Sequence, residues 1–279
     1  MKVPIESIKA NYQVAKQILH KKLDKEKGLD HLENNYQLNR GSATQGINQF
    51  KALIEGKEYK LGGSLLATEY YINQIYNEYG LAQFKISLNS FALHLEYKAK
   101  NGTPLHSHKD LLNDFRNMID NLGPEKTLYV DMDNVLVDFT SSFPKVDQKL
   151  LKKYKNDKDE IPGIFGLMEP MPGAIDSLKH LSQYFDVYFL STAPWDNPSA
   201  WHDKLLWIKE HLPEIGHKRL ILSHHKNLNK GHYIIDDRTK RGVDKFEGEH
   251  IYFGKDGNFK TWEEVVEYLV RKEGIQIEE

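Results

Sequence analysis

The sequence predicts an α/β protein: a C-terminal domain built on a parallel sheet, preceded by a small α+β module. Strand and helix patterns alternate from residue 126 onward, and the expected strands are continuously apolar, as in parallel sheets covered on both faces. Gly123 and Pro124 end a helix and permit a turn. Up to Gly123 the chain has 16 basic and 13 acidic residues, net +3, whereas the remainder has 22 and 27, net −5. We therefore expect two domains, residues 1–123 and 124–279.

The composition excludes several classes of protein. The 279 residues contain no cysteine, which rules out disulfide scaffolds, thiolate zinc sites and cysteine nucleophiles. No apolar run reaches the ~18 residues of a transmembrane helix, and the N-terminus lacks the apolar stretch of a secretory signal. We therefore expect a cytoplasmic protein without a membrane partner.

The first half is predicted to be mostly helical with one hairpin. The spacing of apolar residues predicts four helices, over residues 4–27, 44–55, 62–79 and 107–121. Gly28 is expected to end the first of them. From Phe84 to Leu88 and again from Phe91 to Tyr97, apolar and polar residues alternate around Asn89-Ser90, which predicts a β-hairpin with one buried face.

This half contains two weak candidates for a binding site. His106 and His108 could supply two metal ligands on a strand, or lie in a polar loop after Pro104. Four lysines between Lys21 and Lys27 could contact phosphate, but they alternate with acidic residues as on a solvated helix face. Neither candidate identifies a function.

The second half places polar residues where its strands end. The expected strands cover residues 127–130, 186–190, 220–222, 233–235 and 250–253, and the helices 172–184, 198–211 and 261–270. In parallel sheets, ligands bind at the carboxyl ends of the strands. The residues found there are Asp131, Asp133, Thr192, Lys226, Asp236 and Asp237.

Carboxylates, a hydroxyl and an ammonium at one sheet edge fit phosphoryl transfer. One carboxylate can attack phosphorus and form an aspartyl-phosphate, which splits a hard step into two. A second carboxylate can protonate the leaving oxygen and later deprotonate water. A hard divalent cation such as Mg²⁺ relieves the repulsion between carboxylates, while a lysine and a threonine orient the transferring oxygens. An Asp-x-Asp or Asp-Asp motif alone often forms a turn or a helix cap. The prediction of phosphoryl transfer therefore depends on finding these motifs, with Lys226 between them, in order at the ends of successive strands.

These residues resemble the haloacid dehalogenase superfamily, which has a Rossmann-like three-layer fold. Residues 131–139, Asp-Met-Asp-Asn-Val-Leu-Val-Asp-Phe, are similar to the first motif of the 5'(3')-deoxyribonucleotidases, Asp-Met-Asp-Gly-Val-Leu-Ala-Asp-Phe. Residues 169–174 resemble the family's entry into the helix after its cap. Thr192, Lys226 and the pair Asp236-Asp237 fall on the second, third and fourth motifs. The resemblance covers about residues 126–270 and implies a short helical cap at about 140–169.

The resemblance implies a Mg²⁺-dependent phosphatase of nucleoside monophosphates, deoxyribonucleotides first among them. Asp131 would be the nucleophile and Asp133 the general acid and base. Mg²⁺ would be held by Asp131, the Asp133 backbone carbonyl and one aspartate of the 236–237 pair, with the spacing from Lys226 favouring Asp237. The substrate-binding residues would be Phe139, Thr192, Ala193, Trp195 and Lys226. Phe139 would stack on the nucleobase and Trp195 would lie beside the phosphate; the alternative for both is core packing.

The sequence departs from the family at three points. Asn134 replaces a glycine, and Ala193 replaces a serine, although its backbone N–H can still bind phosphate. The cap is shorter than in the animal enzymes, which would leave the site more open. His224 and His225 could assist phosphate binding or be ordinary loop residues.

Two other functions remain open at this stage. The same chemistry could act on a phosphorylated nucleic-acid end, gripped by the positively charged N-terminal module, and binding would then weaken steeply with salt. Alternatively, the module could be an interaction domain or form a homo-oligomer, because it has amphipathic helices and no catalytic constellation.

Overall fold

The computed structural model describes residues 3–122 and 125–275. The chain divides into two compact units, Met1–Gly123 and Pro124–Glu279. The junction expected at Gly123 and Pro124 lies outside the described residues. Within the described part, no helix combines the length and the apolar character that crossing a membrane requires.

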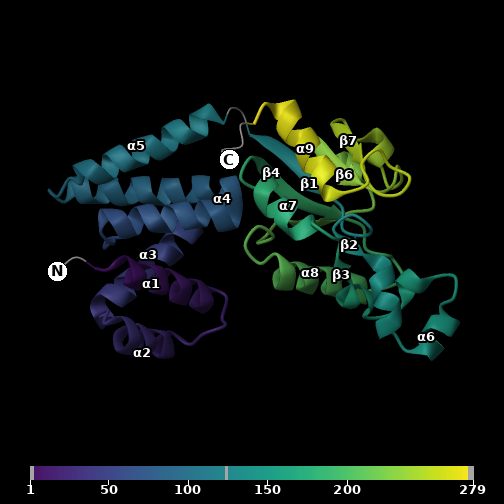
Figure 1. The fold of residues 1–279 in the computed structure, drawn as a ribbon, viewed down its shortest axis with the longest axis horizontal. Helices are drawn as coiled ribbons and strands as arrows, with labels where there is room; N and C mark the ends of the chain where they lie inside the picture. Colours follow the sequence, from purple (N-terminus) through teal and green to yellow (C-terminus); the bar gives the residue numbers. More distant parts are fainter. Residues whose placement is uncertain (1–2, 123–124, 276–279) are drawn as a thin grey trace. The chain divides into compact units, whose positions relative to one another are not determined.

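The N-terminal unit is built from helices in its described part (Figure 1). They are α1 (Ile5–Leu19), α2 (Lys25–Tyr36), α3 (Arg40–Glu55), α4 (Leu65–Lys100) and α5 (His106–Asn121). Helix α4 is kinked at Gly80, whose φ of 79° lies outside the helical region. Tyr12, Phe50 and Phe84 from three of these helices belong to one buried apolar core.

The predicted β-hairpin over residues 84–97 is wrong, because this segment is the second part of α4. Apolar residues do alternate from Phe84, but Ile86 in that alternation is 41% exposed. The side chains that are buried are Leu81, Phe84, Leu88 and Phe91. They are spaced three or four residues apart, which is the helical repeat. The N-terminal module is therefore helical in its described part rather than α+β.

The first predicted helix is also wrong, since it is two helices. Lys21 has a φ of 58°, and the Asp24 side chain then caps α2 by accepting from the Glu26 and Lys27 N–H groups. Gly28 lies inside α2 instead of ending a helix. A Cβ atom at Gly28 would lie 2.8 Å from Val14 Cγ1, so glycine permits close packing of α1 and α2.

The basic and histidine candidates of this unit lie on or beside helices. His106 and His108 lie at the start of α5, where a helix was predicted over residues 107–121, and therefore neither on a strand nor in a loop. Residues two apart on a helix do not face each other, so these histidines are not placed to bind one metal ion together. The four lysines between Lys21 and Lys27 are exposed, as expected for a solvated surface.

The C-terminal unit contains the predicted parallel sheet. Its strands are β1 (Lys126–Val130), β4 (Phe185–Ser191), β5 (Leu220–Leu222), β6 (Tyr233–Asp236) and β7 (Glu249–Tyr252). Their order is β5-β4-β1-β6-β7, and all the pairings are parallel. The α/β fold class predicted from the alternating pattern is confirmed, and β1 lies at the centre of the sheet.

The two faces of this sheet are covered differently. Leu128 and Val130 belong to a large core with residues of α7 (Ala174–Leu181), α8 (Ser199–His211) and α9 (Trp262–Glu273). Side chains alternate along a strand, so Tyr129 faces the other way. It packs with Val243 and Phe246, around the short 3-10 helix η5 (Val243–Lys245).

The segment between β1 and α7 forms a small cap. Strands β2 (Val137–Asp138) and β3 (Glu169–Pro170) pair in antiparallel fashion at its base. Between them lie one α-helix and three 3-10 helices: η1 (Phe139–Lys145), α6 (Gln148–Lys153), η2 (Lys158–Glu160) and η3 (Ile164–Leu167). Asn197, which follows β4, donates to the Asp159 carbonyl at 2.8 Å and the Ile161 carbonyl at 3.0 Å. These bonds tie the cap to the sheet domain.

Candidate active site

The strand order brings the predicted site residues together at the carboxyl edge of the sheet. Strand β1 lies between β4 and β6, so the residues that follow these strands are neighbours. Asp131 directly follows β1, Thr192 follows β4, and Asp236 ends β6. The Asp131 N–H donates to the Ile235 carbonyl at 2.9 Å, which extends the pairing of β1 and β6 into the site.

Lys226 lies buried between two carboxylates. It begins the 3-10 helix η4 (Lys226–Leu228), and its Nζ is 3.0 Å from Asp131 Oδ1 and 2.5 Å from Asp236 Oδ2. Burial raises the pKa of Asp236 to about 7, and the charge of Asp131 adds to this effect. Burial acts on Asp131 in the same direction, but the ammonium groups of Lys226 and Lys204 outweigh it and hold its pKa below the usual value. Of these two carboxyl groups, Asp131 is the one whose pKa is lowered and Asp236 the one whose pKa is raised.

Sequence reasoning missed Lys204, which is fully buried. Its Nζ lies 2.7 Å from Asp133 Oδ2 and 2.9 Å from Ser191 Oγ, and it sits over the Phe165 ring. Burial raises the pKa of Asp133, against the opposing charge of Lys204. The sequence does contain an indication of this burial: Lys204 lies on the same face of α8 as the buried residues Ala200 and Trp207.

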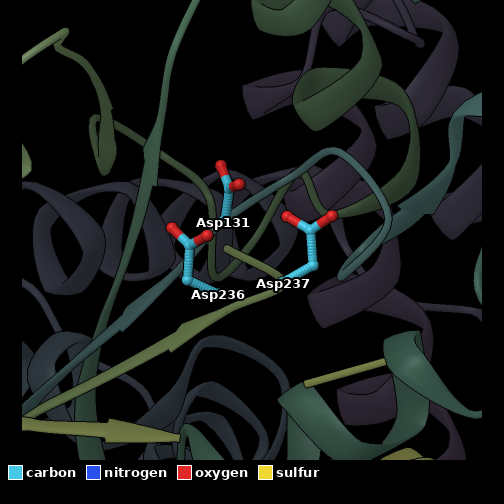
Figure 2. A group of neighbouring side chains, drawn as sticks. All are labelled: Asp131, Asp236 and Asp237. Atoms are coloured by element: carbon cyan, nitrogen blue, oxygen red, sulfur yellow. The ribbon is translucent and has the colours of Figure 1, made fainter. Parts of the chain in front are cut away.

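Asp131, Asp236 and Asp237 form an acidic cluster (Figure 2). Each offers a carboxylate oxygen, and these oxygens lie within 4.8 Å of one another. Asp237 Oδ2 is 3.3 Å from the Asn134 amide nitrogen, and its Oδ1 is 3.3 Å from Arg238 Nε. Clustered carboxylate oxygens are the donors that a hard divalent cation takes, so these residues fit such an ion. Asp133 is outside the cluster, because its side chain is paired with Lys204.

The residues predicted to contact substrate occupy different settings. Asp133, Phe139, Thr192 and Trp195 line one pocket of about 560 Å³. Phe139 packs against two other aromatic rings of the cap, and Trp195 is 79% exposed. The Thr192 hydroxyl donates to the Ser223 carbonyl at 2.9 Å. Ala193 is fully buried and does not line this pocket.

The same pocket is lined by further polar residues, most of which the sequence analysis did not indicate. They are Asn134, Lys155, Asn156, Lys158, Asp159, Glu160, Asp196, His224, Arg238 and Arg241. Four of them are lysine or arginine and three are aspartate or glutamate, so both signs of charge line the pocket. Most belong to the cap or to loops, where spacing along the sequence does not predict spatial proximity. The rings of His224 and Trp195 are nearly perpendicular, with their centroids 6.1 Å apart.

This domain has a parallel sheet, an acidic pair after the central strand, a buried lysine and a second acidic pair. These features together are those of a phosphatase of the haloacid dehalogenase type. Residues 143–268 match the family model of 5' nucleotidase, deoxy (pyrimidine), cytosolic type C protein. The chain is 55% identical over 142 residues to a putative 5'(3')-deoxyribonucleotidase of Vibrio phage KVP40, covering 51% of this chain and 83% of the relative. The chain thus belongs to the 5'(3')-deoxyribonucleotidase family, whose members are phosphoric monoester hydrolases.

More distant relatives carry the same name. A putative 5'(3')-deoxyribonucleotidase of Staphylococcus epidermidis is 35% identical over 92 residues, which is 33% of this chain and half of that protein. The 5'(3')-deoxyribonucleotidase of Bacillus subtilis is 27% identical over 173 residues, 52% of this chain and 99% of that protein.

Proposed function

We propose that the C-terminal unit is a Mg²⁺-dependent phosphatase of deoxyribonucleoside monophosphates that works through an aspartyl-phosphate on Asp131. The observation that carries this proposal is the buried contact of Asp131 with Lys226, beside the carboxylates of Asp236 and Asp237. The names of the relatives support the substrate class, since they are those of deoxyribonucleotidases.

The metal ligands would be Asp131, Asp237 and the backbone carbonyl of Asp133. Asp236 is the poorer candidate because both its oxygens are engaged, one by Lys226 at 2.5 Å and one by the Arg238 N–H at 2.9 Å. The contacts of Asp237 are longer, at 3.3 Å. A bound Mg²⁺ would offset the charge of the carboxylates and polarise a phosphoryl oxygen.

In the first half-reaction, an ionised Asp131 oxygen attacks phosphorus. The bond between phosphorus and the nucleoside oxygen breaks, and that oxygen takes the proton of Asp133. The environments of the two aspartates support these roles, since the pKa of Asp133 is raised by burial while that of Asp131 is held low. Lys226 would stabilise the charge on the transferring group.

In the second half-reaction, water attacks the aspartyl-phosphate. Asp133, now a carboxylate, accepts a proton from this water, and the bond between phosphorus and the Asp131 oxygen breaks. Inorganic phosphate leaves, and both aspartates return to their starting protonation states. Lys204 would hold the Asp133 side chain in place during both steps, through its contact of 2.7 Å.

Phe139 and Trp195 would contact the nucleoside. The packing of Phe139 against Phe143 and Phe165 fixes its ring at the pocket wall. Stacking of a base on such a ring contributes about 1–3 kcal/mol. The hydroxyl of Thr192 already donates to the Ser223 carbonyl, so it would bind phosphate only after it rotates.

A phosphate-release assay on the purified chain tests this proposal. The panel contains dUMP, dTMP, dCMP, dAMP, their ribonucleotide counterparts and p-nitrophenyl phosphate, each with Mg²⁺ and with EDTA. We expect turnover that needs Mg²⁺ and is highest on a deoxyribonucleotide. If no nucleotide is hydrolysed faster than the aryl phosphate, the proposed substrate class is wrong.

A phosphorylated nucleic-acid end is the second candidate substrate. It is favoured by the exposed ring of Trp195 at the pocket and by the basic residues Lys155, Lys158 and Arg241 in its lining. Oligonucleotides with 5' or 3' phosphates belong in the same panel. Preferential hydrolysis of these ends, with binding that falls steeply with salt, would select this candidate over the mononucleotides.

A further inference from the structure

Asn134 has a backbone conformation that few residues adopt. It follows Asp133 in the turn after β1, and its φ is 59°, in the left-handed region. Its N–H donates to the Val137 carbonyl at 2.7 Å, which closes the turn. Asparagine is among the few residues other than glycine that visit this region readily, so it fits here without large strain. The sequence departs from the family's glycine at this position, and conformation alone does not require that change.

The side chain of Asn134 reaches a carboxylate of the acidic cluster. Its Nδ2 lies 3.3 Å from Asp237 Oδ2, although the two residues follow different strands. The other Asp237 oxygen is near Arg238 Nε, also at 3.3 Å. The Arg238 side chain is 53% exposed, whereas the Asn134 amide projects from a turn closed by a backbone hydrogen bond. Arg238 is thus the more solvent-exposed of the two partners.

The two aspartates at the end of β6 have different partners: Asp236 contacts a buried ammonium, whereas Asp237 contacts the neutral amide of Asn134 and the exposed guanidinium of Arg238. Lys226 lies against Asp236 and compensates its charge. The amide of Asn134 donates to Asp237 but carries no charge, so it orients the carboxylate without competing with a cation for it. Hydrogen-bond partners of metal ligands commonly fix ligand orientation in this way, and their loss weakens metal binding about 10–100-fold.

We infer that Asn134 is a positioning residue that orients Asp237 toward a divalent cation. This inference rests on the proposed metal site. It assigns to Asn134 the task of holding Oδ2 and thereby fixing the orientation of the whole carboxylate. The inference concerns ion affinity rather than the chemical step, because Asn134 would act only through Asp237.

The test is a calorimetric titration of the full chain with Mg²⁺, without substrate. Asn134→Gly removes the amide while keeping a residue that tolerates a positive φ, so the turn should survive. Lys218→Gly is the matched control, because Lys218 is exposed, lies in the same unit and has a φ of 61°. We expect the dissociation constant to rise about tenfold in Asn134→Gly and to stay unchanged in Lys218→Gly.

A kinetic measurement provides a second readout. In Asn134→Gly the Mg²⁺ concentration for half-maximal turnover should rise by the same factor, while kcat at saturating Mg²⁺ stays near that of the wild type. Equal Mg²⁺ affinity in the variant and the wild type would overturn the inference, as would an equal loss in Lys218→Gly. A wild-type chain that binds no Mg²⁺ would instead refute the proposed metal dependence, whatever Asn134 does.

Discussion

The two units of this protein bury different kinds of polar group. In residues 3–122, the buried polar side chains are Ser7, Asn11, Gln49, Thr68, Ser87, Ser90 and His94, and none belongs to Asp, Glu, Lys or Arg. In residues 125–275, Asp131, Lys204, Lys226 and Asp236 are buried as well. Burying a charge costs far more than burying an amide or a hydroxyl. The charges are therefore concentrated where the proposed reaction needs them.

The buried polar groups of the two units also have different hydrogen-bond partners. The side chain of Gln49 bonds to uncharged groups of the same unit. Its Nε2 donates to Thr68 Oγ1 at 3.0 Å, and its Oε1 accepts from the Gly63 N–H at 2.7 Å. Lys226 and Lys204 instead contact carboxylates proposed to act in catalysis. The comparison predicts that polar substitutions in the first unit change stability alone, whereas those in the second also change turnover.

The largest effect is expected for Lys226→Ala. Its ammonium opposes charge that develops on the transferring phosphoryl group, and loss of one such contact typically costs about 10²–10³ in rate, or ~2.7–4 kcal/mol. Steady-state kinetics on the best nucleotide measure this loss, with the exposed Lys230→Ala as a matched control. Turnover close to that of the control would show that Lys226 is structural.

A smaller effect is expected for Lys204→Met. Methionine keeps much of the buried volume but leaves Asp133 without its ammonium, which should destabilise the chain by about 2–3 kcal/mol. Turnover should fall too, because the proposed acid and base loses its fixed position. Denaturant unfolding and kinetics check both effects; a stable variant with full activity would remove Lys204 from the proposed mechanism.

For Gln49→Leu we expect a loss of stability without a loss of turnover. The change deletes the bond to Thr68 and leaves the Gly63 N–H without its acceptor, at a cost of about 1–2 kcal/mol. Phosphatase kinetics at a temperature where the chain stays folded should match those of the wild type. Reduced turnover there would contradict the separation of roles between the two units.

The smallest effect tests the helix that replaces the expected hairpin. Ile86 is exposed in α4, so Ile86→Ser should change the free energy of unfolding by less than about 0.5 kcal/mol. Leu88→Ser, two residues on, removes a buried side chain and should cost several times more. Equal losses in both variants would favour the hairpin, in which both side chains would be buried.

The sequence was sufficient to predict the sheet and the polar residues at the ends of its strands, because this information is local. Strands of β-branched and aromatic residues end directly in Asp131, Thr192 and Asp236, and parallel topology then brings these residues together. The prediction of a hairpin was wrong because the apolar residues from Phe84 onward fit both the strand repeat and the helical repeat. The structure shows that the helical set, spaced three and four apart, is the buried one.

The unpredicted features depend on contacts between distant parts of the chain. Lys204 and Asp133 lie on different elements, and nothing near either residue in the sequence indicates their contact of 2.7 Å. The pocket lining from the cap, including Lys155 and Lys158, depends in the same way on how the cap folds back over the site. The contact of Asn134 with Asp237 was invisible in sequence for the same reason.

The most direct test of the account is to trap the covalent intermediate. The full chain is mixed with ³²P-labelled deoxyribonucleotide and Mg²⁺, quenched in acid during turnover, digested and mapped by mass spectrometry. We predict label on the peptide that contains Asp131, released by hydroxylamine as expected of an acyl phosphate and absent from Asp131→Asn. Asp256→Asn, which removes an exposed carboxylate, should label like the wild type. Rapid turnover with no labelled peptide, or label that persists in Asp131→Asn, would contradict the assignment of Asp131 as the nucleophile.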